Sequence, residues 1–82
     1  MPTVLRSGTL RIVIYPNDHD PPHAHVIGPD GEAKIALATS GHRPHLLQTE
    51  GLSRRELGAA LREVDAHSAL LWECWRDIHG RD

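Results

Sequence analysis

The chain has 82 residues and a formal net charge of -2. This length fits one small domain with a thin core, which buries roughly 60 % of the unfolded surface. This net negative charge does not predict a nucleic-acid-binding surface, although the sequence is compatible with local basic patches.

The single cysteine and the lack of long apolar runs bear on the compartment. Cys74 has no second cysteine with which to form an internal disulfide, which fits a reducing environment. No apolar run approaches the ~20 residues that a bilayer span needs. Residues 1–8 carry a charge and a glycine where a signal peptide has its apolar stretch. We therefore expect a soluble, cytoplasmic, single-domain protein over residues 1–82.

The first residues predict a β-hairpin. Val4–Arg6 and Thr9–Tyr15 read as strands joined by Ser7-Gly8, in which glycine supplies a positive φ. With this turn, the residue numbers of two directly facing residues add up to 15, so that Leu5 faces Leu10. One face then carries no charge and forms the expected core side: Leu5, Leu10, Ile12 and Ile14. Pro16 ends the second strand because it cannot donate to the ladder.

A second hairpin follows. His23–Ile27 and Glu32–Leu37 read as strands around Gly28-Pro29-Asp30-Gly31, a strong turn signal. An even-length turn makes facing positions sum to 59, so that His25 lies opposite Lys34. One face is apolar, with Ala24, Val26, Ala33, Ile35 and Leu37. The other is mostly polar, with His23, His25, Ile27, Glu32 and Lys34.

Residues 38–51 are the least regular part. Fourteen residues are long for a featureless loop in a small domain, so His45–Gln48 is a candidate fifth strand. His42 and His45 lie in a Gly/Pro context and are expected to face solvent.

The remainder is helical. Ser53 and Glu56 form a capping box, with Ser53 as the N-cap. Apolar residues then recur at helical spacing through residue 78. We expect two helices, or one helix with a kink near residues 66–68, and Gly80 is a plausible stop.

These elements predict an α+β fold. A four- or five-stranded antiparallel meander within residues 3–48 precedes a helical part within residues 53–79, which packs on one face of the sheet. The expected core consists of Leu5, Leu10, Ile12, Ile14, Val26, Ile35, Leu37, Leu57, Leu61, Val64, Leu71 and Trp75.

Residues 17–25 concentrate the ionisable groups. The segment holds three imidazoles, two carboxylates and the stiff Pro21-Pro22 pair. Residues two apart on a strand point the same way, so His23 and His25 can share a face, and the loop can bring His19 back to them. We expect the three rings to gather in one solvent-filled pocket.

A metal centre is one interpretation of this cluster. His19, His23 and His25, with an open coordination position, would suit zinc or another transition metal. Asp18 or Asp20 could hold a ring N–H in the outer shell. The competing interpretation is that the histidines hydrogen-bond to the backbone and fix the turn into the third strand. No fourth ligand stands at a recognisable spacing, which favours the backbone interpretation.

Acid–base catalysis without a metal is another interpretation. Neighbouring histidines can act as base and acid while Lys34 stabilises a developing negative charge, and Tyr15 could join them. The candidate catalytic residues are His19, His23, His25 and Lys34, in cleavage of RNA through its 2′-hydroxyl. The competing interpretation is an ordinary solvated sheet face.

Two tryptophans lie in the last predicted helical segment. Trp75 matches the core phase of the last helix and Trp72 sits beside it. An exposed tryptophan is a good interface anchor, so Trp72 and Trp75 are candidate contacts with a protein partner. The alternative is that both rings close over the short sheet.

Four stretches resemble the small bacterial domain-of-unknown-function family 4160. They are Met1–Arg6, Asp18–Val26 with its His-x-Pro-Pro-His-x-His core, Gly31–Ile35 and Gly51–Leu57. The resemblance covers nearly the whole chain, although residues 38–50 depart from the family pattern. It implies a cytoplasmic protein with a small protein partner encoded by a neighbouring gene, because members have been proposed as halves of toxin–antitoxin-like pairs. It supplies no established chemistry.

Two classes of function follow. The first is one component of a toxin–antitoxin-like pair, with ribonuclease-type histidine chemistry on an RNA substrate. The second is a non-catalytic metal-binding or regulatory interaction module, including the antitoxin role. A homo-oligomer is compatible with both.

Overall fold

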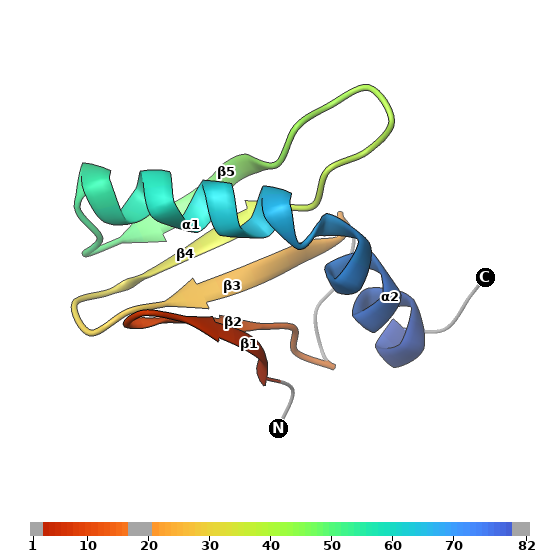
Figure 1. Cartoon of the computed structure of the whole chain (residues 1–82), viewed down its shortest axis with the longest axis horizontal. Coiled ribbons are helices and arrows are strands. Elements are labelled where there is room, and N and C mark those ends of the chain that lie inside the picture. Colours follow the sequence, from red (N-terminus) through yellow and green to blue (C-terminus); the bar gives the residue numbers. More distant parts are fainter. Residues whose placement is uncertain (1–2, 17–20, 80–82) are drawn as a thin grey trace.

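The chain folds into one antiparallel sheet followed by two helices. The computed structural model describes residues 3–16 and 21–79. The sheet order β1-β2-β3-β4-β5 is a simple meander, with α1 across one face of the sheet and α2 at the end of the sheet where β3 begins (Figure 1). The bounds are β1 Thr3–Ser7, β2 Leu10–Val13, β3 His23–Ile27, β4 Glu32–Ala36, β5 His45–Glu50, α1 Arg54–Ala66 and α2 Ser68–His79. The α+β prediction is confirmed, with five strands and two helices.

The first hairpin turns one residue later than the sequence predicts. Leu5 faces Ile12 and Ser7 faces Leu10, so facing positions sum to 17 rather than 15. The two turn residues are Gly8-Thr9, and Gly8 has φ 60°. A positive φ at the first central residue is the type II′ pattern, which suits the twist of a hairpin. Because this register differs from the predicted one by two, Leu5, Leu10 and Ile12 stay on one face as predicted. A bulge between Thr3 and Leu5 shifts the pairing at the start of β1, where Thr3 faces Val13.

The second hairpin has the predicted register. His25 faces Lys34 and Ile27 faces Glu32, so facing positions sum to 59. The Gly28 N–H donates to the Gly31 carbonyl at 2.9 Å and closes the turn. β4 ends at Ala36, one residue before the predicted end.

The predicted fifth strand exists and is longer than expected. β5 runs from His45 to Glu50 and pairs with β4, with a bulge where Lys34 gives way to Ile35. All six of its residues are exposed, as an edge strand on a small sheet allows. His42 and His45 are exposed, as predicted.

The helices begin and break where the sequence indicates. The Ser53 N–H donates to Glu56 Oε1 at 2.8 Å, and the Glu56 N–H donates to Ser53 Oγ at 3.1 Å. His67, with φ -111° and ψ 28°, leaves the helical region and separates α1 from α2. Two helices rather than one long helix are therefore confirmed. The predicted stop at Gly80 lies outside the described residues.

The core lies between the sheet and the helices. Its buried residues are Leu10, Ile12, Ile14, Ala24, Val26, Ala33, Ile35, Leu37, Ala60, Val64, Leu71 and Trp75. Leu5, Leu57 and Leu61, also predicted as core, pack at its margin and are half-buried. Within residues 3–16 and 21–79, neither helix has the length and apolar character to cross a membrane.

Candidate functional site

The side of the sheet that faces away from the helices, here called the open face, carries the predicted site. His25 on β3 pairs with Val13 on β2 and with Lys34 on β4. Lys34 in turn pairs with Gln48 on β5. Four strands thus contribute one row of side chains, and the predicted pairing of His25 with Lys34 is confirmed.

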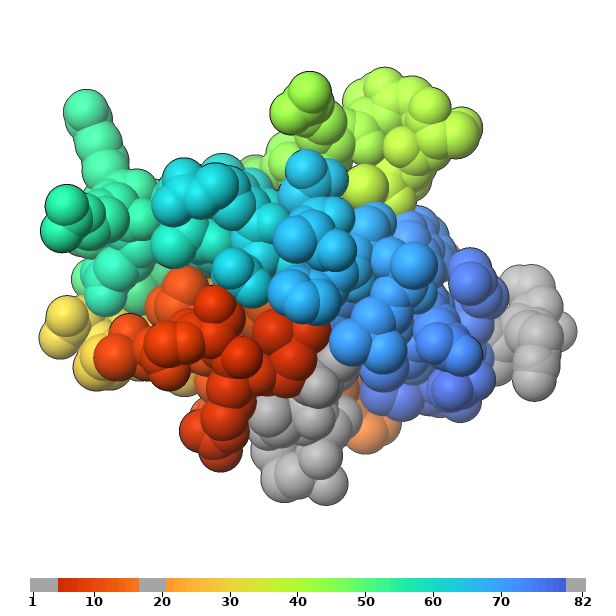
Figure 2. All heavy atoms as spheres, in the orientation of Figure 1, coloured from red at the N-terminus to blue at the C-terminus, as the bar shows by residue number. Residues whose placement is uncertain are grey.

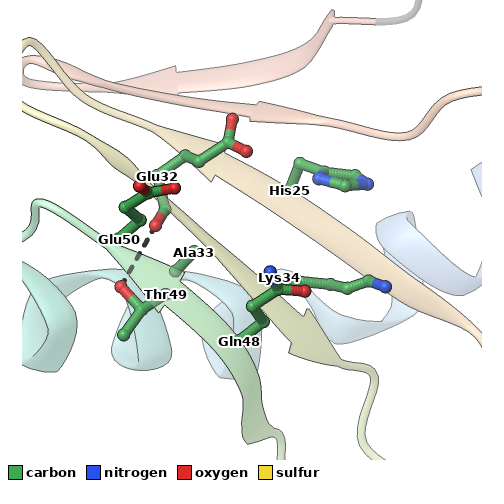
Figure 3. Close-up of a pocket in the computed structure, with 7 residues that line it drawn as sticks. All are labelled: His25, Glu32, Ala33, Lys34, Gln48, Thr49 and Glu50. Carbon is green, nitrogen blue, oxygen red and sulfur yellow. Dashed lines mark hydrogen bonds between the residues drawn. The ribbon is translucent and has the colours of Figure 1, made fainter.

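A small pocket opens on this face beside that row. Its volume is about 110 Å³, and it is lined by His25, Glu32, Ala33, Lys34, Gln48, Thr49 and Glu50. In Figure 3 the side chains of His25 and Lys34 extend toward one end of the pocket, whereas Glu32 and Glu50 lie at the other end. The Thr49 hydroxyl donates to the Glu32 carbonyl at 3.1 Å and ties β5 to β4 at the pocket wall.

Two rings hold the His25 imidazole in place. The ring centroids of Tyr15 and His25 are 4.8 Å apart with an interplanar angle of 66°. The centroids of His23 and His25 are 5.1 Å apart at 67°. Both contacts are edge-to-face, the arrangement that aromatic quadrupoles favour. Tyr15 therefore joins His25, as the sequence suggested, and helps to fix the orientation of its ring.

His23 lies in a different environment from the one predicted. The expectation that it would share a solvent-filled pocket with His25 is wrong, because His23 is only 3 % exposed. Its Nδ1–H donates to the Pro21 carbonyl at 2.7 Å, as the backbone interpretation held. The ring of Trp75 on α2 lies 5.6 Å away, so the helix closes over this end of the sheet. His23 supports the neighbouring His25 ring from beneath the surface.

The sequence did not point to His79, which extends this buried cluster. Its ring stacks on Trp75 with centroids 3.8 Å apart, and its Nδ1–H donates to the Trp75 carbonyl at 3.1 Å. The available signal was the i,i+4 spacing of Trp75 and His79 on one helix. The rings of His23, Trp75 and His79 therefore form one series of contacts that reaches His25.

The sequence also missed the acidic end of the pocket. Glu32 faces Glu50 across β4 and β5, an arrangement of like charges that costs stability in a sheet. The sequence places Glu32 only on the mostly polar face of the second hairpin, opposite Ile27. Only the register of β5 reveals the pair, because Glu50 lies beyond the predicted end of that strand. Lys34, two residues from Glu32, is on the same face and supplies positive charge.

The structure tests the predicted metal centre only in part, since His19 lies outside the described residues. Within residues 3–16 and 21–79, no three histidine, cysteine or carboxylate side chains gather closely enough to hold a metal ion. His23 and His25 are neighbours, but the first is buried and the second faces the pocket. A site at these two rings would need further ligands, so the metal interpretation stays a prediction.

The two predicted interface tryptophans have different environments. Trp75 is buried in the core at 6 % exposure, where its ring contacts the chain's own residues. Trp72 is half-buried, and its Nε1–H donates to the Ala38 carbonyl at 2.6 Å. Trp75 thus has little surface to offer a partner, whereas Trp72 keeps an accessible edge beside residues 38–40.

Comparison with known proteins identifies a family. Residues 10–76 match the family described as a domain of unknown function, DUF4160. No curated protein and no solved structure gave a match to the chain. The matched segment begins at β2 and ends within α2, and it includes every residue that lines the pocket on the open face. The chain therefore belongs to the DUF4160 family.

Proposed function

We propose that this protein is the RNA-cleaving component of a toxin–antitoxin-like pair in the bacterial cytoplasm, with its active site in the pocket at His25. The observation that carries the proposal is that an imidazole, an ammonium group and carboxylates line one pocket, the first two at one end and the carboxylates at the other (Figure 3). His25, Lys34 and Glu32 all line it. A base, an acid and a cation in one place are what cleavage of RNA through its 2′-hydroxyl requires.

The roles follow from position on the sheet. Glu32 is the diagonal cross-strand neighbour of His25, because His25 faces Lys34 and Glu32 lies two residues away on the same face. Such neighbours have Cα atoms about 7–8 Å apart, which leaves room for a phosphodiester between them. Glu50 is one strand further from His25. Glu32 is accordingly the base and His25 the acid.

The proposed reaction is a transesterification. Glu32 accepts the proton of the 2′-hydroxyl, and the 2′-oxygen bonds to phosphorus. The bond from phosphorus to the 5′-oxygen breaks, and protonated His25 donates a proton to that leaving oxygen. Lys34 stabilises the added negative charge on the phosphoryl oxygens. The products are a 2′,3′-cyclic phosphate and a 5′-hydroxyl, with no oxidant or reductant consumed.

The family resemblance supports the pairing with a second protein. Members of the family that the chain resembles have been proposed as halves of toxin–antitoxin-like pairs, and a chain of 82 residues has a thin core that a partner can supplement. The accessible edge of Trp72 gives such a partner an aromatic contact.

The experiment is cleavage of a short fluorescent RNA by the purified protein. His25→Ala should lower the rate at least about 100-fold, because general acid catalysis contributes on that scale. His45→Ala is the matched control: His45 is also a strand histidine but is exposed on the edge strand. Equal rates for wild type and His25→Ala would refute the active site, as would equal losses in both variants.

A non-catalytic metal-binding or regulatory module is the second candidate, favoured by one observation. The Nδ1–H of His23 donates to the Pro21 carbonyl, which orients the ring, so that Nε2 is the nitrogen through which the ring would bind a metal. Metal-bound histidines commonly have this arrangement. Elemental analysis of tag-free protein tests it: one equivalent of a transition metal, lost in His23→Ala, would favour this candidate.

A further inference from the structure

A groove lies between α2 and the segment that follows β4. It is lined by Ala38, Thr39, Ser40, Ser68, Ala69, Trp72 and Arg76, and its volume is about 600 Å³. Figure 2 shows the yellow-green segment that contains residues 38–40 rising beside the blue residues of α2. The volume is within the range of about 300–1,000 Å³ that small-ligand sites occupy.

The groove differs from the pocket at His25 in its charge. Its lining has one guanidinium, at Arg76, and three hydroxyl groups, at Thr39, Ser40 and Ser68. Among the residues that the structure describes, the groove lining includes no carboxylate, whereas Glu32 and Glu50 both line the pocket on the open face. Hydrogen-bond donors and positive charge without an opposing acid favour an anionic ligand.

The cation in this groove is held in position. The Trp72 indole is fixed by its hydrogen bond to the Ala38 carbonyl at 2.6 Å. The guanidinium carbon of Arg76 lies 5.8 Å from the centroid of the Trp72 ring, within the range of a cation–π contact. A cation–π contact uses none of the guanidinium N–H groups as hydrogen-bond donors to the ring plane, and the planar set of N–H donors of an arginine matches phosphate oxygens.

The groove also lies close to the histidine end of the sheet. Ala36 faces His23, and Ala38 in the groove is two residues further along the chain. At about 3.3 Å per extended residue, this places the groove wall roughly 7 Å beyond the strand position opposite His23. Trp75, whose ring contacts His23, is the residue before Arg76 on α2.

We infer that this groove is a subsite for a phosphate of single-stranded RNA, with Arg76 as the binding residue and Trp72 as its positioning residue. The inference rests on the proposed function, which it deepens by naming where the substrate is held. Among the described residues that line the pocket at His25, one ammonium group faces two carboxylates, so this lining attracts a polyanion weakly. An anion site at the adjacent end of the sheet supplies the missing attraction.

The test is equilibrium binding of a fluorescent oligouridylate, measured by anisotropy at several salt concentrations in a His25→Ala background that prevents cleavage. Arg76→Gln should weaken binding about tenfold, as expected for loss of one charge-assisted contact. The slope of log affinity against log salt should become shallower by about 0.7, the value for one phosphate contact on a single strand. Trp72→Ala should produce a similar loss, and Arg62→Gln, on the exposed part of α1, should produce none.

The outcomes separate this inference from the catalytic proposal. If Arg76→Gln binds the oligonucleotide as tightly as its parent, the subsite is refuted, even where His25→Ala abolishes cleavage. If Arg76→Gln loses binding while wild type cleaves no RNA, the subsite stands and the catalytic proposal fails. Binding of a polyglutamate peptide in place of the oligonucleotide would overturn the inference and make the groove a docking surface for an acidic protein.

Discussion

His25 lies directly opposite Lys34 on adjacent antiparallel strands, and both side chains line the same pocket. Directly facing residues have Cβ atoms about 4.5–5.5 Å apart, so the imidazole and the lysine stem approach closely without any loop to position them. Tyr15 and His23 press edge-on against the His25 ring from the other side. The sheet register therefore brings the two residues together, and the ring contacts orient His25.

The first prediction concerns the charge of Lys34. If the ammonium group stabilises the phosphoryl oxygens, Lys34→Gln should lower the RNA-cleavage rate roughly 100-fold, whereas Lys34→Arg keeps the charge and should lose much less. Initial rates measured at saturating RNA give both values. Equal losses in the two variants would indicate that Lys34 acts through packing or shape rather than charge.

The second prediction concerns Gly31, which lets the end of β5 approach the turn between β3 and β4. A Cβ on Gly31 would overlap the Glu50 carbonyl oxygen and lie 2.7 Å from the Gly51 Cα. Because these neighbours are backbone atoms, they cannot move aside cheaply, and Gly31→Ala should destabilise the fold by about 2 kcal/mol or more.

The control for that change is Gly41→Ala, since a Cβ there meets nothing within 4 Å. Urea unfolding of both variants measures the difference in free energy of unfolding. A Gly31→Ala protein as stable as Gly41→Ala would show that β5 does not approach the turn in this way.

The third prediction concerns the start of α1. Ser53→Ala removes the side chain that accepts the Glu56 N–H and breaks the capping box. The expected cost is about 1 kcal/mol, a drop in Tm of about 4–8 °C for a domain of this size. Thermal unfolding followed by circular dichroism gives the shift. Ser40→Ala, at an exposed serine outside the helices, should leave the Tm unchanged.

The fourth prediction concerns the reactivity of Cys74. Burial raises the pKa of its thiol, and the neighbouring carboxylates of Asp77 and Glu73 raise it further. Because the thiolate is the reactive form, Cys74 should react with iodoacetamide more slowly than a free thiol at neutral pH, and faster as the pH rises. Asp77→Asn should speed the reaction at fixed pH by removing a negative charge. An unchanged rate in that variant would contradict a contribution from Asp77 and leave burial and Glu73 as the causes.

The sequence predicts the second hairpin well because local features decide its register. The Gly28–Gly31 turn has an even number of residues, which decides which residues face each other. The alternation of apolar residues then decides which face of the hairpin is buried. The first hairpin is predicted on the correct faces but in the wrong register. Ser7-Gly8 and Gly8-Thr9 are both acceptable two-residue turns, and they differ by two positions in the pairing.

The burial of His23 could not be predicted from local patterns. It depends on where α2 goes after His67 breaks the helix, because that direction brings Trp75 against the start of β3. Helical periodicity identifies the apolar stripe of α2 but says nothing about its direction. The acidic end of the pocket is hidden for a related reason. Glu50 faces Glu32 only through the register of β5, an exposed strand with no burial alternation to read.

The central claim is acid–base cleavage through the 2′-hydroxyl at the pocket that contains His25. The most direct measurement is the chemical identity of the 3′ end of the cleaved RNA, determined by mass spectrometry. We expect a 2′,3′-cyclic phosphate, no product from a substrate with a single 2′-deoxy nucleotide at the scissile position, and no product with His25→Ala. Cleavage of the 2′-deoxy substrate, or a wild-type protein that leaves RNA intact, would contradict it.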